Sequence, residues 1–405
     1  MRVAVPNTVA NATTSAGAPG VNRPVVAAAL AVLAVLGSAS YRAAGTEMIA
    51  LLAIGAGLGI ALYHAGFGFT GSWRKFLVQQ KGAGLRWQMV MIALTASAFL
   101  PLFAQGSVFG QPVSGAIAPV GVSVIVGAFL FGIGMQVGGA CASGTLFTTG
   151  SGNTRMIATL IFFVAGSLLG TLHMPWWLDR PGLGGVSLQG MFGVWPAIGL
   201  TWAICGAVAL SSVWSERRAY GHLAGDEAPP RPAWRRAFQG PWPLAAAALV
   251  LAALNLATLT ISGSPWSVSF GYALWGAQAA SALGLDVASW PFWTWEGPRA
   301  ALAGGVFANA ASVMNFGIVA GALLGAGLAG RFAPTRHVPW KLLLASAIGG
   351  MLMGYGARLA FGCNIGALFS GIASGSLHGW LWLVCALLGN WAGIHVRPLF
   401  GMART

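Results

Sequence analysis

A lone cysteine behind a glycine-rich apolar run occurs twice in this chain. The first copy runs from Gly132 to Phe147 and holds Cys141, and the second lies 222 residues later and holds Cys363. The other pairs that coincide at this offset are Gly127/Gly349, Gly132/Gly354, Gly134/Gly356, Gly144/Gly366, Leu146/Leu368 and Phe147/Phe369. The apolar piece after each cysteine is too short to cross a bilayer, which takes ~20 residues. Because irregular backbone is tolerated inside a membrane only where protein or a water-lined cavity satisfies it, each break predicts a re-entrant half-helix beside a transport pathway.

The composition indicates a membrane protein. Hydrophobic residues make up 57% of the chain and charged residues 7%, with a mean hydropathy of +0.75, whereas soluble domains carry about 25% charged residues. The formal charge of +14 would fit nucleic-acid binding, but the basic residues are scattered between apolar runs and are better interpreted as orientation signals. The four widely spaced cysteines form neither a CxxC motif nor a zinc-binding pattern, so no metal site and no cofactor are expected.

Ten apolar runs approach the length of a spanning helix. They lie near residues 25–40, 48–64, 87–104, 113–136, 155–172, 193–213, 242–263, 303–330, 342–360 and 376–396. Four shorter pieces, predicted to be re-entrant, lie near 67–79, 141–151, 266–283 and 363–374. We therefore predict an all-α, polytopic membrane protein, an inverted repeat with about ten spanning helices and four short re-entrant half-helices surrounded by membrane lipid. Residues 1–24 are predicted to be a disordered tail ahead of a single transmembrane domain, 25–405; a cleaved signal ending near Ser40 is the alternative to a first span.

The basic residues predict the orientation. With a cytoplasmic amino terminus and four pieces that do not cross, all but four of the 21 Lys and Arg residues fall inside, as the positive-inside rule requires. Five predicted crossings separate the starts of repeat one, 48–172, and repeat two, 242–396, so the repeats are expected to enter from opposite faces. The linker 214–241 is then cytoplasmic. An aromatic belt at the outer interface is expected from Trp176, Trp177, Trp290, Trp293 and Trp295.

The acidic residues are all predicted to lie in loops or at span ends. They are Glu47, Asp179, Glu216, Asp226, Glu227, Asp286 and Glu296. Since acids inside a membrane usually mark cation sites and proton relays, a cation or proton pump is disfavoured. The amino termini of half-helices instead offer free N–H groups and partial positive charge. This environment suits an anion.

The residues predicted to line the pathway surround the two cysteines. They are Thr70, Ala140, Cys141, Ser143, Thr145, Arg358, Gly362, Cys363 and Asn364. A neutral thiol is a weak donor that can contact a soft sulfur atom without trapping it. Two alternatives stay open: Arg358, near the end of its span, is equally well explained by snorkelling to the surface, and Asn364 by interhelical hydrogen bonding. Cys205 and Cys385 are interpreted as packing residues.

These segments resemble a known family. Gly134–Thr145 and Gly356–Gly366 resemble the two Gly-Gly-Cys signatures of the YeeE/YedE family of sulphur transporters, and Gly66–Arg74 resembles its amino-terminal Arg-Phe-Cys-x-Thr-Gly segment. The resemblance covers about residues 48–396. It implies a multi-pass inner-membrane importer of thiosulfate, of hourglass shape, with cysteines along a central route. It also implies a soluble sulphur-carrier protein of the TusA type as cytoplasmic acceptor.

One position departs from the family pattern. Gly68 stands where the family has its first cysteine, so Gly68 joins the predicted pathway and the substrate is thiosulfate or another sulfur-containing anion. Two other functions were weighed. A membrane sulfurtransferase that forms cysteine persulfides would need an activating base, for which only His64 is near, and a channel for a small neutral solute would leave the cysteines as packing. No P-loop motif occurs, so movement down a gradient is expected.

Overall fold

The computed structural model describes residues 20–223, 232–335 and 337–404. Within these ranges ten helical segments are long and apolar enough to cross a membrane, with α2–α3 and α5–α6 each counted as one segment. The prediction of an all-α, polytopic membrane protein is thereby confirmed. The predicted disordered tail lies, up to residue 19, outside the described residues, and so do residues 224–231 of the predicted linker.

The first part of the chain supplies nine helices. They are α1 (Arg23–Ala44), α2 (Thr46–Ala65), α3 (Phe69–Gln79), α4 (Ala83–Gln105), α5 (Val122–Gly138), α6 (Ala142–Gly150), α7 (Thr154–Leu178), α8 (Leu188–Phe192) and α9 (Val194–Tyr220). The short strands β1 (Ser107–Val108) and β2 (Gln111–Pro112) pair with each other, and β3 (Pro119–Gly121) pairs with β4 (Gly182–Gly185); both pairs are antiparallel.

The rest of the chain holds a second series. Its α-helices are α10 (Ala233–Gln239), α11 (Leu244–Ser262), α12 (Ser269–Ala282), α13 (Pro291–Thr294), α14 (Glu296–Gly304), α15 (Ala310–Leu328), α16 (Trp340–Leu359), α17 (Gly371–Ala373) and α18 (Leu377–Val396). The π-helix η3 covers Asn364–Ser370, and 3-10 helices cover η1 (Val287–Ser289), η2 (Val306–Ala308) and η4 (Arg397–Phe400).

Short helices occupy all four segments predicted to hold them. These are α3, α6 and α12, and η3 continued by α17. Each follows a long helix, and a residue with positive φ lies between the long helix and the short one: Gly66 (56°), Gly139 (95°), Gly263 (70°) and Phe361 (55°). A left-handed residue ends a helix and turns the chain away from its axis. Three of the four are glycines, which adopt this conformation without strain.

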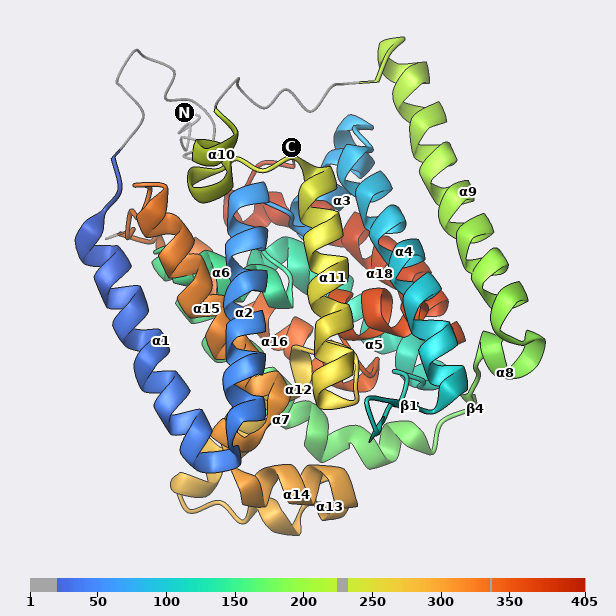
Figure 1. The fold of residues 1–405 in the computed structure, drawn as a ribbon. Coiled ribbons are helices and arrows are strands. Elements are labelled where there is room, and N and C mark those ends of the chain that lie inside the picture. The colour runs from blue at the N-terminus through green and yellow to red at the C-terminus, as the bar shows by residue number, and fades with distance from the viewer. Residues whose placement is uncertain (1–19, 224–231, 336, 405) are drawn as a thin grey trace.

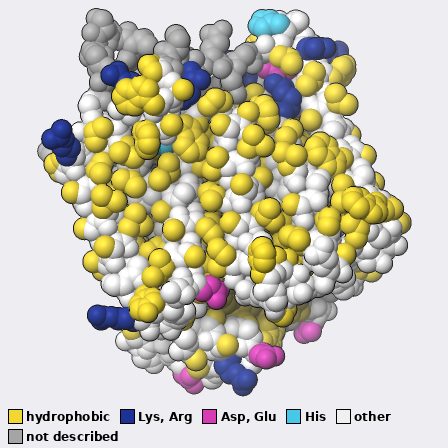
Figure 2. Space-filling model, in the orientation of Figure 1, with side chains coloured by type: hydrophobic (Ala, Val, Ile, Leu, Met, Phe, Trp, Pro, Cys, Tyr) yellow, Lys and Arg dark blue, Asp and Glu magenta, His cyan; other side chains and the backbone are white. Residues whose placement is uncertain are grey.

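The helices form a bundle with two distinct ends (Figure 1). We call the end that carries α10 the α10 face, and the opposite end, across which α13 and α14 lie, the α14 face. The ends of α3 and α9 also lie at the α10 face. Figure 2 shows hydrophobic side chains over the middle of one side of the molecule, and most of its Lys, Arg, Asp and Glu side chains toward the two ends. This distribution is that of a bundle surrounded by lipid.

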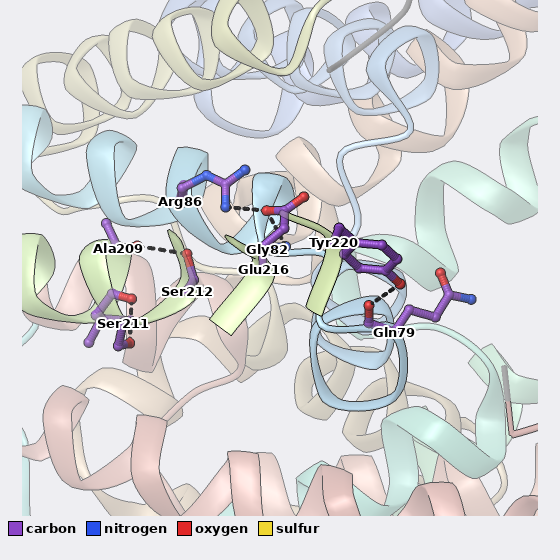
Figure 3. Close-up of polar contacts among 9 residues, drawn as sticks. Gln79, Gly82, Arg86, Ala209, Ser211, Ser212, Glu216 and Tyr220 are labelled. Atoms are coloured by element: carbon purple, nitrogen blue, oxygen red, sulfur yellow. Dashed lines mark hydrogen bonds and ion pairs between the residues drawn. The ribbon is translucent and has the colours of Figure 1, made fainter. Parts of the chain in front are cut away.

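The predicted end of the span at 193–213 was wrong. Helix α9 continues to Tyr220, so Glu216 lies near the end of this helix and not in the linker. Its carboxylate is fully buried and accepts hydrogen bonds from Arg86 Nη1 (2.6 Å) and from the backbone N–H of Gly82 (3.2 Å), while Tyr220 donates to the carbonyl of Gln79 (2.7 Å) (Figure 3). These contacts anchor a polar helix end. The length of an apolar run does not predict where such a helix ends.

Further corrections concern helix starts and one tryptophan. The run at 113–136 becomes helical only at Val122, because β3 precedes it, and the run at 303–330 only at Ala310, after η2. Trp293 does not belong to an aromatic belt, since its side chain is 0% exposed and donates to Thr171 Oγ1 (3.1 Å). Trp176, by contrast, is 54% exposed. A belt tryptophan and a core tryptophan have the same local sequence signal.

The helix contacts of the two halves correspond to each other. Helix α7 packs on α16 as α18 packs on α5, and α2 packs on α15 as α11 packs on α4. At the centre, α5 packs on α16. A Cβ added at Gly127 would lie 2.7 Å from the carbonyl oxygen of Gly356, and one added at Gly349 would lie 2.8 Å from that of Gly134. These are equivalent contacts at the 222-residue offset, and both need a glycine because the backbones touch.

Candidate functional site

Cys141 caps the amino terminus of α6. Its Sγ accepts the backbone N–H of Gly144 (3.4 Å) and lies 3.6 Å from Ser143 Oγ, and its side chain is 1% exposed. Thr145 Oγ1 donates back to the carbonyl of Cys141 (2.9 Å). The next carbonyl, that of Ala142, accepts from Tyr272 Oη of α12 (2.8 Å). The hairpin is therefore held against a short helix of the other half of the chain.

Cys363 has the same role at η3. Its Sγ accepts the backbone N–H of Ile365 (3.4 Å), and its side chain is 0% exposed. A Cβ at Gly362 would lie 2.5 Å from the backbone nitrogen of Ala367, so the glycine is required by the tight turn itself. Helix η3 is a π-helix, a rare form that often occurs at functional sites.

The fold brings the two predicted cysteines together. Helices α6 and η3, which begin directly after Cys141 and Cys363, contact each other, and Tyr272 of α12 donates to the Cys141 hairpin. Neither thiol forms a disulfide. Each Sγ accepts an N–H from its own helix; the S–H of Cys363 has no acceptor among the described residues, whereas Cys141 also has the hydroxyl of Ser143 beside it.

Gly68 and Thr70 begin the first short helix. Gly68 precedes α3 with an extended backbone (φ −107°), and a Cβ added there would meet only the carbonyl oxygen of Gly66, at 4.0 Å. The space beside Gly68 is thus open. Thr70 is 3% exposed, and its carbonyl accepts from Gln136 Nε2 (3.1 Å), which also donates to Asn390 Oδ1. The Gln136 side chain therefore joins α3, α5 and α18.

Arg358 and Asn364 carry buried polar groups without partners among the described residues. The Nη1 atom of Arg358 makes no hydrogen bond, although the side chain is only 8% exposed. Its guanidinium lies between two rings, 5.8 Å from the centroid of Phe270 and 5.6 Å from that of Phe292, so the snorkelling interpretation is wrong. Asn364 is 0% exposed, and both its amide oxygen and its amide nitrogen are unpaired.

Such orphaned groups are candidates for contact with a ligand. A buried donor or acceptor without a partner costs about 1–3 kcal/mol, and native proteins leave few of them without a reason. Arg358 lies in the last turn of α16, five residues before Cys363, and Asn364 follows Cys363 directly. The group of Arg358, Cys363 and Asn364 therefore offers one positive charge, one thiol and one amide to a solute. Of the two readings of Asn364, interhelical bonding has no support in the described contacts.

The remaining candidates lie close to these groups. Ala140, Ser143 and Thr145 are all buried around Cys141. Four residues precede the four short helices: Gly68, Cys141, Val268 and Cys363. The first turn of each short helix is mostly buried, so free N–H groups and partial positive charges enter the interior of the bundle. In the described residues, no three His, Cys, Asp or Glu side chains are placed to hold a metal ion.

Sequence reasoning missed Tyr272 and Asn315. Tyr272 is fully buried, contacts the Cys141 hairpin and packs on Phe163 with ring centroids 4.5 Å apart. Asn315 Nδ2 donates to the carbonyl of Val268 (2.9 Å) and holds the start of α12. Two signals in the sequence could have found them: the phenol of Tyr272 in the short apolar piece 266–283, and the amide of Asn315 in the run 303–330. Polar side chains in apolar helices are expected to have a defined partner.

The comparisons with known proteins agree with this architecture. A protein family described as "Sulphur transport" matches residues 64–392. The chain belongs to this family. The resemblance identified from the two cysteine signatures is thus confirmed, and the chain is a membrane transporter rather than an enzyme.

Individual relatives carry more specific names. The chain is 28% identical over 359 residues to "Thiosulfate transporter TsuA" of Spirochaeta thermophila, covering 84% of this chain and 96% of the relative. It is 24% identical over 358 residues to the protein of the same name in Escherichia coli, covering 86% and 94%. A match to "Probable transporter YedE" of Escherichia coli is 29% identical over 170 residues but covers only 42% of this chain and 41% of that relative.

Proposed function

We propose that this protein imports thiosulfate or a related sulfur-containing anion across the bacterial inner membrane, along a route between Cys141 and Cys363. The observation that carries the proposal is the occurrence of two buried thiols, each at the amino terminus of a short helix, on two short helices that contact each other. Relatives that match most of this chain are named thiosulfate transporters, which supports the choice of substrate.

The chemistry of the route matches that of the anion. Thiosulfate carries charged oxygens and one soft terminal sulfur. Free N–H groups at the short helices and the guanidinium of Arg358 favour the charge, while the S–H groups contact the sulfur weakly enough for release. Asn364 adds an amide that has no other partner among the described residues. No energy source is needed if the anion moves down its gradient toward cytoplasmic consumption.

The two halves supply one thiol each, and we propose that they form an inverted repeat in a single transmembrane domain. The equivalent contacts of Gly127 with Gly356 and of Gly349 with Gly134 support a two-fold relation. Inverted repeats place a site between their broken helices near the middle of the membrane. Cys141 would then open toward the α10 face and Cys363 toward the α14 face.

A soluble sulphur-carrier protein of the TusA type is the proposed acceptor at the α10 face. Exposed basic side chains lie on the helix ends and turns of that face, namely Lys75, Lys81, Arg217, Arg218 and Arg235. They would attract an acidic partner. The charge-reversed variant Lys81→Glu/Arg217→Glu is expected to lose co-purification with such a carrier while retaining its fold.

Radiolabelled thiosulfate uptake into cells that lack other sulfur importers tests the route. The variant Cys141→Ala/Cys363→Ala is expected to lose at least about 90% of uptake. The matched control is Cys205→Ala/Cys385→Ala, which removes the two buried thiols outside the site and is expected to transport normally. Uptake by the first variant at the level of the control would reject the thiol route.

A further inference from the structure

Three arginines gather on the α10 side of the Cys141 hairpin. Arg155 Nη2 donates to the carbonyl of Val137 (3.1 Å), and Arg397 Nη1 donates to the carbonyl of Gln136 (2.8 Å). These carbonyls belong to consecutive residues at the end of α5, so both arginines bind the same helix end. Arg397 is 8% exposed, so its charge is largely withdrawn from water.

Arg74 comes from α3 and completes the cluster. The carbonyl of Thr70 accepts from the Gln136 side chain, and Arg74 lies one helical turn after Thr70, on the same face of α3. Gln136 links the two sides of the cluster, because its side chain donates to the Thr70 carbonyl of α3 and its own carbonyl accepts from Arg397. The three positive charges therefore share one region, although they come from α3, α7 and η4.

No acidic side chain neutralises this cluster in the part of the chain that the structure describes. The ion pair found there joins Arg86 to Glu216, and none involves the three arginines. Like charges held together in a partly dry region repel one another, because the surroundings screen them poorly. A bound anion would remove that repulsion.

Helix capping explains only part of the arrangement. Cations at a helix carboxyl end are favourable, and this accounts for the bonds of Arg155 and Arg397 to α5. It does not account for Arg74, which makes no hydrogen bond to any described residue, and it leaves Arg155 Nη1 and Arg397 Nη2, which are not among the buried unpaired atoms, accessible to a solute. A Cβ at Gly139 would lie 3.4 Å from Arg155 Nη1, so this nitrogen lies beside the loop that leads to Cys141.

We propose that Arg74, Arg155 and Arg397 form a binding site for a small divalent oxyanion, such as thiosulfate or sulfate, at the α10 end of the route. Guanidinium groups present paired N–H donors that match the oxygens of such anions. The chain after η4 covers one side of the site: Arg397 Nε donates to the carbonyl of Ala403 (2.7 Å), and Arg155 Nη2 contacts Met402 Sδ (3.5 Å). This cover favours a small free anion over a lipid headgroup.

The inference that the anion passes this site last on its route rests on the proposed transport function. The inference that the site binds an anion does not. Isothermal titration of the purified full-length protein in detergent, with sulfate and with thiosulfate, measures binding directly. Arg74→Gln is expected to weaken both affinities about 10-fold, since a charge-assisted hydrogen bond contributes about 1.5–3 kcal/mol and 1.4 kcal/mol is tenfold. The matched control Lys75→Gln, an exposed neighbour on the same helix, is expected to change them less than about 2-fold.

Two outcomes would overturn the site. Equal affinities in Arg74→Gln and Lys75→Gln would show that the cluster does not bind the anion. Binding of phosphatidylglycerol, competed by neither sulfate nor thiosulfate, would assign the cluster to a lipid headgroup instead. The thermal midpoint of each variant establishes that it is folded.

The variant Cys141→Ala/Cys363→Ala separates this proposal from the transport route. It is expected to lose uptake but to bind sulfate with wild-type affinity at the arginines. Normal uptake with arginine-dependent binding would reject the thiol route and retain the anion site. Lost uptake in the cysteine variant, together with sulfate binding that is unchanged in Arg74→Gln, would retain the thiol route and reject the anion site.

Discussion

Asn364 and Asn390 are both fully buried, but their amides are paired to different extents. Neither the oxygen nor the nitrogen of the Asn364 amide has a partner among the described residues, whereas Asn390 Oδ1 accepts from Gln136 and only Asn390 Nδ2 is unpaired. An unpaired buried polar atom destabilises a protein. Removing the Asn364 side chain should therefore cost the fold less than removing that of Asn390.

We expect Asn364→Ala to reduce thiosulfate uptake several-fold without lowering the thermal midpoint of the purified protein. The substitution removes no hydrogen bond to a described residue, so the loss of packing is offset by removal of an unpaired group. Asn390→Ala is the control and is expected to destabilise the protein by about 1–3 kcal/mol, because Gln136 loses an acceptor. A midpoint that falls equally in both variants would contradict a ligand-binding role for Asn364.

Gly68 gives a second prediction at the scale of one residue. Its extended backbone suits any residue, and the space beside it is open. Gly68→Cys is therefore expected to keep the thermal midpoint within about 2 °C and to raise thiosulfate uptake by adding a third thiol to the route. Uptake below the wild-type rate, measured with radiolabelled thiosulfate, would show that the space itself is needed by the substrate.

At the scale of the elements, glycine contacts set the distance between α5 and α16. The nearest atom to a Cβ at Gly127 is the backbone nitrogen of Ala360, at 2.7 Å, and the nearest to one at Gly349 is the backbone nitrogen of Gly138, at 2.1 Å. Backbone cannot move aside as a side chain does, so even a methyl group separates the helices. The cysteine hairpins follow these two helices, and their approach depends on this packing.

Gly127→Ala and Gly349→Ala are each expected to lower stability by about 1–3 kcal/mol, the usual cost of overpacking. Gly206→Ala in α9 is the matched control, since a Cβ there meets no atom within 4 Å. It is expected to stabilise α9 slightly, because glycine is unfavourable inside a helix. Thermal unfolding in detergent measures all three. Unchanged midpoints in the first two variants would show that the helices are not in contact as described.

For the whole molecule, the proposed inverted repeat has a direct consequence for access. In a background of Cys205→Ala/Cys385→Ala, we expect Cys141 to react with a small impermeant thiol reagent only from the α10 side, and Cys363 only from the α14 side. Thiosulfate is expected to slow both reactions, because it occupies the same route. Reaction of both thiols from one side of sealed vesicles, measured by mass spectrometry, would exclude a route that passes between them.

At the scale of the whole molecule, some features could be predicted from the sequence and others could not. The ten spans and the four short helices were predicted because apolar length and glycine breaks are local properties that the bilayer requires. The two cysteine hairpins were found because they repeat. The end of α9 and the position of Trp293 were predicted wrongly, since an anchored helix end and a buried tryptophan depend on partners far away in the chain.

The amino-acid sequence alone determined the class of fold, the family and the two residues around which the route is proposed. Only the tertiary structure decided which groups meet: Tyr272 with the Cys141 hairpin, Arg397 with the end of α5, and Arg358 with two aromatic rings. The physical reason is range. Hydrophobicity and backbone freedom act within one segment, whereas a hydrogen bond between residues 261 positions apart exists only after the helices have packed.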